Sequence, residues 1–169
     1  MPTGLKRYQQ TQNFHFVTFS CYRRQPFLES EAAKDVTQQI LEEVRQKQQL
    51  CIAAYVLMPE HVHLLTNEPG VGTLATFLQI FKQRSSRKLK HPDQKQFWQL
   101  RYYDFNVHSE EKRVEKIRYI HRNPVRRGLV RAPEDYRWSS FNHYATGDAG
   151  PIEIESEATA YRRERAQHG

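Results

Sequence analysis

Cysteines, long apolar runs and a glycine-rich nucleotide loop are scarce or missing in this sequence. Cys21 and Cys51 are the only cysteines, and they form neither a CxxC pair nor a disulfide framework, so we expect both to be small buried hydrophobic residues. No apolar run approaches the roughly 20 residues that span a bilayer. Residues 1–10 lack the apolar core of a signal peptide. We therefore expect a cytoplasmic location and no membrane partner. There is no GxxxxGK[ST] loop of the kind that binds ATP.

Basic and apolar residues are both well represented. The 169 residues carry 26 Lys and Arg against 19 Asp and Glu, a formal charge of +7 with a pI near 9.5, and 38% of them are hydrophobic. That length and apolar content predict one globular domain with a real core. The excess of positive charge favours a polyanionic partner, with nucleic acid as the leading class.

Hydrophobic patterning predicts the element order β-α-β-β-α-β-α. We expect strands at 14–21, 51–58, 61–66 and 101–107, and helices after Ser30, Thr73 and Ser109, the last ending near Arg122 before Asn123-Pro124. This order is that of the α+β ferredoxin-like split βαβ fold, an antiparallel sheet with helices on one face, plus one extra C-terminal helix. We expect a domain over 1–145 and a basic, partly helical tail over 146–169.

A His-x-His pair lies on the third predicted strand. Residues two apart on a strand point to the same face, so His61 and His63 stand side by side with Val62 turned away. Two imidazoles are incomplete for structural zinc but suit a cation that keeps open positions for phosphate oxygens. The alternative is a pair of exposed polar residues on a half-buried sheet.

A tyrosine stands away from the apolar stripe of the third helix. At about 100° per residue, Val114, Ile117 and Ile120 fall on one side, whereas Tyr119 and Asn123 fall on the other, one turn apart. A phenol and an amide oxygen could therefore be held beside one cation on a rigid helix. The alternative is a surface tyrosine on a solvated helix face.

Several motifs between residues 14 and 144 resemble one family. LMPEHVH at 57–63 resembles the HUH motif of single-tyrosine transposases. YIHRNPV at 119–125 followed by GLV at 128–130 resembles the tyrosine-bearing helix of the REP-associated tyrosine transposases. WQ at 98–99, RYYD at 101–104 and WSS at 138–140 are similar to the same family.

That resemblance implies a mechanism and a site. Tyr119 would be the nucleophile, and His61, His63 and Asn123 would hold a divalent metal ion, Mg²⁺ or Mn²⁺. A phenol has a pKa of about 10 and needs such help to attack phosphorus. The products would be a 5′-phosphotyrosine and a free 3′-hydroxyl, and the substrate a palindromic DNA hairpin with an unpaired segment. A monomer or a homodimer is compatible with this, with the site formed in cis or in trans.

Single-stranded DNA requires a basic track and aromatic faces. The candidate DNA-binding residues lie on the second helix, before the fourth strand and at the end of the third helix: Arg84, Arg87, Lys88, Arg101, Arg122, Arg126 and Arg127. A solvated charged face is the alternative for each. Trp98 is either a stacking platform or a core residue, and Tyr103 is the second candidate nucleophile.

Two other functions compete with this one. A non-catalytic nucleic-acid-binding ferredoxin-like domain is one, although the aromatic RNP1 pattern is not visible on the central strands. The other is a metal-dependent phosphodiesterase that uses water and releases both DNA ends. A covalent protein–DNA adduct distinguishes these possibilities.

Overall fold

The computed structural model describes residues 13–169 and contains the predicted antiparallel sheet. Its strands are β1 (Phe14–Ser20), β2 (Ile52–Leu57), β3 (His61–Thr66) and β4 (Tyr103–Val107), in the spatial order β2-β3-β1-β4. All three pairings are antiparallel. This confirms the ferredoxin-like α+β fold. The first twelve residues of the predicted 1–145 domain lie outside the described residues.

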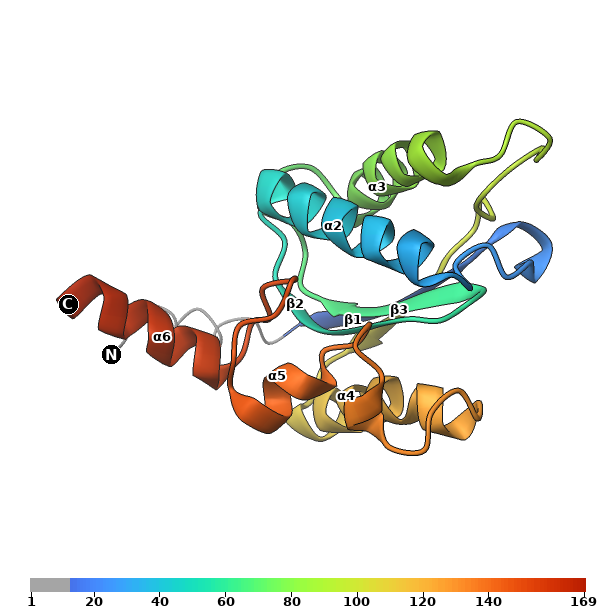
Figure 1. The fold of residues 1–169 in the computed structure, drawn as a ribbon. Helices are drawn as coiled ribbons and strands as arrows, with labels where there is room; N and C mark the ends of the chain where they lie inside the picture. Colours follow the sequence, from blue (N-terminus) through green and yellow to red (C-terminus); the bar gives the residue numbers. More distant parts are fainter. Residues whose placement is uncertain (1–12) are drawn as a thin grey trace.

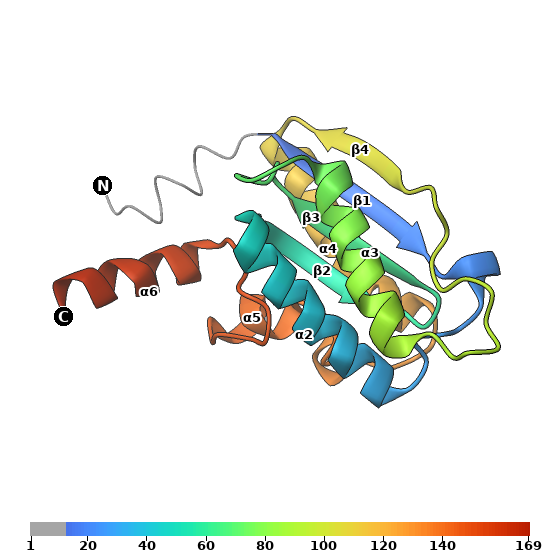
Figure 2. The same cartoon turned by 90° about the horizontal axis from the view of Figure 1, so that it is seen from above.

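Two long helices cover one face of the sheet and a third covers the other. α2 (Glu31–Gln48) and α3 (Leu74–Leu89) lie side by side on one face, whereas α4 (Glu110–Arg126) lies on the opposite face (Figures 1 and 2). The side chains of Ser30, Thr73 and Ser109 accept hydrogen bonds from the first turns, which confirms the three predicted helix starts. α4 is the predicted extra helix.

β1 shows how strand alternation serves the two faces. Phe19 is buried against Phe81 of α3, with 5.6 Å between ring centroids. Phe16 points the other way and contacts Tyr119 of α4, at 5.9 Å. Because side chains alternate along a strand, one strand supplies both the core under α2 and α3 and the surface on which α4 rests.

The chain beyond α4 completes the outer edge of β2. It contains the 3₁₀ turn η2 (Pro133–Asp135) and the helices α5 (Phe141–Thr146) and α6 (Glu157–His168). Ser139 bridges to Val56, and Ile154 bridges in parallel to Ile52. Ile154 is buried. The segment just before α6 therefore contributes to the core, and the division between 1–145 and 146–169 stays a prediction.

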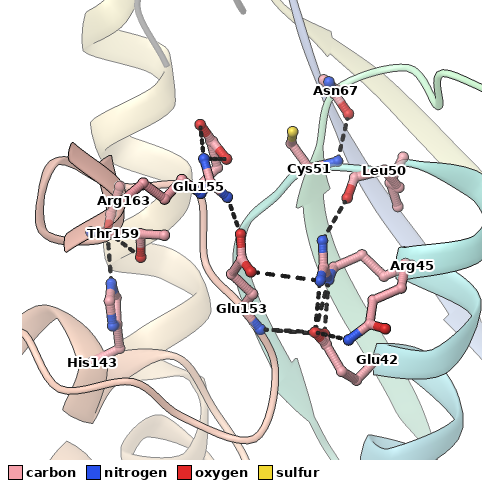
Figure 3. A network of polar contacts seen from close by, with 12 residues as sticks. Glu42, Arg45, Leu50, Cys51, Asn67, His143, Glu153, Glu155, Thr159 and Arg163 are labelled. Carbon is pink, nitrogen blue, oxygen red and sulfur yellow. Dashed lines mark hydrogen bonds and ion pairs between the residues drawn. The ribbon is translucent and has the colours of Figure 1, made fainter. Parts of the chain in front are cut away.

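A polar network fixes this C-terminal segment to α2 (Figure 3). The Arg45 guanidinium contacts the carboxylates of Glu42, at 2.7 Å, and Glu153, at 3.8 Å. Arg163 of α6 pairs with Glu153 and with the buried Glu155, in the latter case at 3.2 Å. Ion pairs thus connect α2 to the strand-like segment and that segment to α6.

The predicted end of α4 was wrong. The helix continues through Pro124 to Arg126 instead of ending near Arg122. A proline in a helix removes one backbone donor, but the backbone N–H of Arg127 still donates to Asn123 and that of Leu129 to Pro124. The fixed φ of proline is itself helical, so one further turn forms. β4 also starts later than predicted, at Tyr103 instead of Arg101.

Cys21 and Cys51 are both buried, as predicted. Among residues 13–169, no helix has the length and apolar content that crossing a membrane requires.

Candidate active site

The two histidines of β3 converge on the α4 side of the sheet. The Nε2 atoms of His61 and His63 lie 3.1 Å apart, and each residue is 5% exposed. Their other ring nitrogens are occupied: His61 Nδ1 lies 2.8 Å from Glu60 Oε1, and His63 Nδ1 lies 2.7 Å from Thr18 Oγ1. Both rings are therefore oriented so that their Nε2 atoms point to one place.

Burial keeps both imidazoles neutral at ordinary pH. Desolvation lowers the pKa of His61 despite the opposing effect of Glu60. Desolvation, reinforced by the positive potential of neighbouring groups, lowers the pKa of His63 to about 3. A neutral imidazole has the lone pair that a cation requires.

α4 brings two further side chains to this place. Asn123 is buried, and its side-chain amide lies 3.4 Å from His61 Nε2. The Tyr119 ring packs edge-on against the His63 ring with 5.4 Å between centroids, yet Tyr119 remains 40% exposed. The buried Ile120 anchors the helix between them. The four predicted site residues thus meet within one chain.

The donor set fits a divalent cation with open coordination positions. The described residues hold no group of three or more His, Cys, Asp or Glu side chains that could bind a metal, so the donors here are two imidazoles and an amide. An amide can turn to present its oxygen in place of its nitrogen. Such a set is too small for a closed zinc site and leaves room for phosphate oxygens.

The sequence-based prediction missed Glu60. This side chain is 7% exposed, and its Oε1 accepts hydrogen bonds from His61, from Arg127 at 2.5 Å and from Arg24 at 3.5 Å. Burial alone would raise the pKa of Glu60, but the hydrogen bonds from Arg127 and His61 hold it below its usual value. The signal in the sequence that could have indicated Glu60 is its position directly before the histidine pair.

The predicted DNA-binding residues fall into separate regions. Arg122 and Arg126 line a groove of about 490 Å³ together with Tyr119 and Arg118, which the prediction had omitted. Arg127, 44% exposed at its side chain, pairs with Glu60. The α3 residues Arg84, Arg87 and Lys88 belong to the helix on the opposite face, and Arg84 pairs with Glu43 of α2.

Arg101 and Tyr103 line a different hollow, of about 780 Å³, beside Thr18. Tyr103 of β4 pairs with Thr18 of β1, and Thr18 pairs in turn with His63 of β3. β1 therefore lies between Tyr103 and His63. Trp98 is a core residue, 4% exposed, whose indole N–H donates to Ser85.

The fold and the site together define a single-tyrosine domain of the HUH class, in which paired histidines on a strand face a tyrosine on a helix. The chain belongs to the family described as Transposase IS200 like, whose model matches residues 8–123.

Comparison with known proteins identifies individual relatives. The REP-associated tyrosine transposase of Escherichia coli K12 is 24% identical over 111 residues, which cover 65% of this chain and 66% of that protein. A Haemophilus influenzae protein, provisionally given the same name, is 25% identical over 111 residues, with 58% and 62% covered. The match therefore spans slightly less than two thirds of each relative.

A solved structure of a REP-associated tyrosine transposase bound to a REP hairpin superimposes with a TM-score of 0.69. It is 21% identical, and the match covers 85% of this chain and 86% of that one. At this identity the likeness establishes the shared fold.

Proposed function

We propose that this chain cleaves and rejoins single-stranded DNA by metal-dependent transesterification, with Tyr119 as the nucleophile. The observation that carries the proposal is the contact of the Tyr119 ring with His63, where two imidazole nitrogens converge. Membership of a transposase family supports it. The substrate we propose is a palindromic hairpin with an unpaired segment, because the structural relative is bound to a REP hairpin.

His61, His63 and Asn123 are the proposed ligands of Mg²⁺ or Mn²⁺. When bound, such a cation polarises the phosphate and stabilises negative charge in the transition state. Oη of Tyr119 attacks the scissile phosphorus, and the bond from phosphorus to the 3′ oxygen breaks. The phenolic proton is lost and the leaving oxygen is protonated, which yields a 5′-phosphotyrosine and a free 3′-hydroxyl. Attack by a 3′-hydroxyl reverses the step without ATP, because the phosphotyrosine retains the bond energy.

The surroundings of Tyr119 suit this role. Phe16 and His63 pack against its ring and restrict its rotation, while its exposure leaves the hydroxyl accessible to a strand. The Arg126 guanidinium lies 5.8 Å from the ring centroid. Arg118, Arg122 and Arg126 line the same groove and would hold phosphates there. Tyr119 contacts His63 of its own chain, and this contact supports a site formed in cis.

The first test compares wild type with Tyr119→Phe. Each protein is incubated with Mn²⁺ and an end-labelled hairpin built from repeats that flank the gene, and the products are separated on a denaturing gel. We expect a metal-dependent covalent protein–DNA band in the wild type and none in the variant. Tyr103→Phe is the matched control and should keep the band.

Other outcomes would identify a competing function. Cleavage without an adduct in wild type would indicate a hydrolase that uses water. An adduct that survives Tyr119→Phe and disappears in Tyr103→Phe would move the nucleophile to Tyr103. Binding without cleavage would indicate a non-catalytic DNA-binding domain.

A further inference from the structure

His121 is a buried polar side chain of α4 that the proposed chemistry does not use. It is 7% exposed, and its Nε2 lies 2.7 Å from Oγ of Ser140. Successive helix residues are about 100° apart, so His121 lies on the opposite flank of α4 from Tyr119 and Asn123. One flank of the helix therefore meets the histidine pair, and the other meets the chain that follows η2.

Ser140 is itself fixed to the edge of the sheet at β2. Its backbone N–H donates to the carbonyl of Tyr55 at 3.0 Å, and its Oγ accepts from the backbone N–H of Tyr55, also at 3.0 Å. The rings of Phe141 and Tyr144 pack against the His121 ring, with centroid distances of 5.6 and 5.4 Å. His121 is therefore joined to β2 through one intermediate residue and is confined by two aromatic rings.

α4 buries fewer apolar side chains than the two helices on the other face. The buried apolar residues of α4 are Ile120 and Pro124, whereas α2 buries three aliphatic residues and α3 buries two leucines and two phenylalanines. Apolar burial is non-directional, so it fixes the rotation of a helix about its axis only weakly where few side chains are buried. A buried hydrogen bond has a preferred distance and direction. The contact of His121 with Ser140 supplies that constraint for α4.

We propose that His121 and its partner Ser140 set the rotation of α4. Through this contact the helix presents Tyr119 and Asn123 to the histidine pair. His121 is then a positioning residue, because it acts through the helix and not on the substrate. The inference rests on the proposed function, since it concerns the placement of the proposed nucleophile and of one proposed ligand. Placement matters because a shift of about 1 Å can slow an enzyme by about 100-fold.

The first measurement compares His121→Leu with His143→Leu, which removes a second histidine of the same kind. His143 is also 7% exposed, and its Nε2 lies 2.6 Å from Oγ of Ser156, in the chain beyond α4. The rate of adduct formation is measured with saturating Mn²⁺ and saturating hairpin. We expect His121→Leu to lower this rate by about 10- to 100-fold and His143→Leu to leave it unchanged. Neither change should alter Kd for the hairpin, measured by fluorescence anisotropy without metal.

The second measurement follows the rotation of α4 directly. The rings of Tyr119 and Phe16 pack edge to face with 5.9 Å between centroids, so a nuclear Overhauser effect between their ring protons reports this rotation without DNA or metal. We expect the effect in wild type and in His143→Leu, and its loss in His121→Leu. His121→Gln keeps a polar nitrogen near the position of Nε2 and should restore both the ring signal and the rate.

Ser140→Ala breaks the same contact from the other side and changes the size of the side chain little. It should lower the rate and the ring signal as well. Combined with His121→Leu it should lower the rate no further, because both changes remove one shared interaction. The proposal would be overturned if His121→Leu kept either the wild-type rate or the ring signal, or if His143→Leu lost both to the same extent.

The proposal and the proposed function can fail separately. If wild type forms no adduct while His121→Leu still loses the ring signal and His143→Leu keeps it, the catalytic function fails and the positioning contact stands. If wild type forms the adduct and His121→Leu keeps its rate and its ring signal, the positioning contact fails and the catalytic function stands.

Discussion

At the residue scale, Glu60 connects three parts of the molecule. Its carboxylate contacts His61 on β3, Arg127 at the end of α4 and Arg24 after β1. A carboxylate that accepts the Nδ1 proton of a histidine fixes the tautomer in which Nε2 carries the lone pair and makes that nitrogen a better ligand. Glu60 is therefore a positioning residue for His61.

We expect Glu60→Gln to weaken Mn²⁺ binding by about 10- to 100-fold, the usual effect of losing such a partner. Titration of the protein with Mn²⁺, followed by electron paramagnetic resonance of the free ion, measures this without reference to activity. Glu43→Gln is the control, since Glu43 pairs with Arg84 on the other side of the sheet. Equal affinity in Glu60→Gln and wild type would contradict a positioning role.

The sequence predicted which residues gather at the candidate site better than it predicted what supports them. Strand and helix periodicity paired His61 with His63 and Tyr119 with Asn123, the family resemblance joined the two pairs into one site, and the structure places them together. Thr18 was missed because its contact with His63 depends on the pairing of β1 with β3. No local pattern specifies that pairing.

At the scale of elements, α4 has a buried side that contacts the histidine pair and an exposed side that carries basic residues. Its inner side places Asn123 against His61 and buries Ile120, whereas its outer side exposes Arg118, Arg122 and Arg126 beside Tyr119. The basic residues of α3 lie on the far side of the sheet. Two helices with similar sequence patterns therefore differ in their access to the candidate site.

Salt dependence of DNA binding should distinguish these two helices. Each cation that neutralises a phosphate of single-stranded DNA contributes about −0.7 to the slope of log K against log salt. We expect replacing Arg118, Arg122 and Arg126 together by Gln to reduce that slope by about 2. The matched triple replacement of Arg84, Arg87 and Lys88 on α3 should change it by less than about 1. A larger change from the α3 triple would place the strand on the other face.

The boundaries of the helices were predictable where a side chain specifies them. Each of the three helices begins after a hydroxyl side chain that caps backbone donors of the first turn: Ser30, Thr73 and Ser109. The end of α4 was not predictable, because a proline such as Pro124 ends a helix only where backbone hydrogen bonds do not support the next turn. Here the carbonyls of Asn123 and Pro124 both accept backbone hydrogen bonds from beyond the helix.

At the scale of the whole molecule, the sheet depends on a distant part of the chain. β2 would present an open outer edge without residues 138–140 and 152–156, which bridge to it and bury Ile152 and Ile154. The sequence indicated the order of strands but not this closure, because Gly147, Gly150 and Pro151 suggest a detached tail.

Truncation tests how much the folded domain needs this segment. A chain ending at residue 145 loses two buried isoleucines, each contributing about 1.5 to 3 kcal/mol, and we expect its free energy of unfolding to fall by about 3 kcal/mol or more. A chain ending at residue 156 keeps both and should lose clearly less, because only Thr159 and Ala160 of α6 are buried. Urea denaturation of the three lengths measures this. Equal stability of 1–145 and the full chain would support the predicted domain limit.

The register of β3 determines both which residues enter the core and which face the candidate site. Val62 and Leu64 are fully buried in the core, while His61 and His63 between and beside them face α4. A slip of one residue would exchange the two sets and place imidazoles in the apolar interior. A chain with a slipped strand would therefore lose both its apolar core and the pair of imidazoles that the proposed reaction needs.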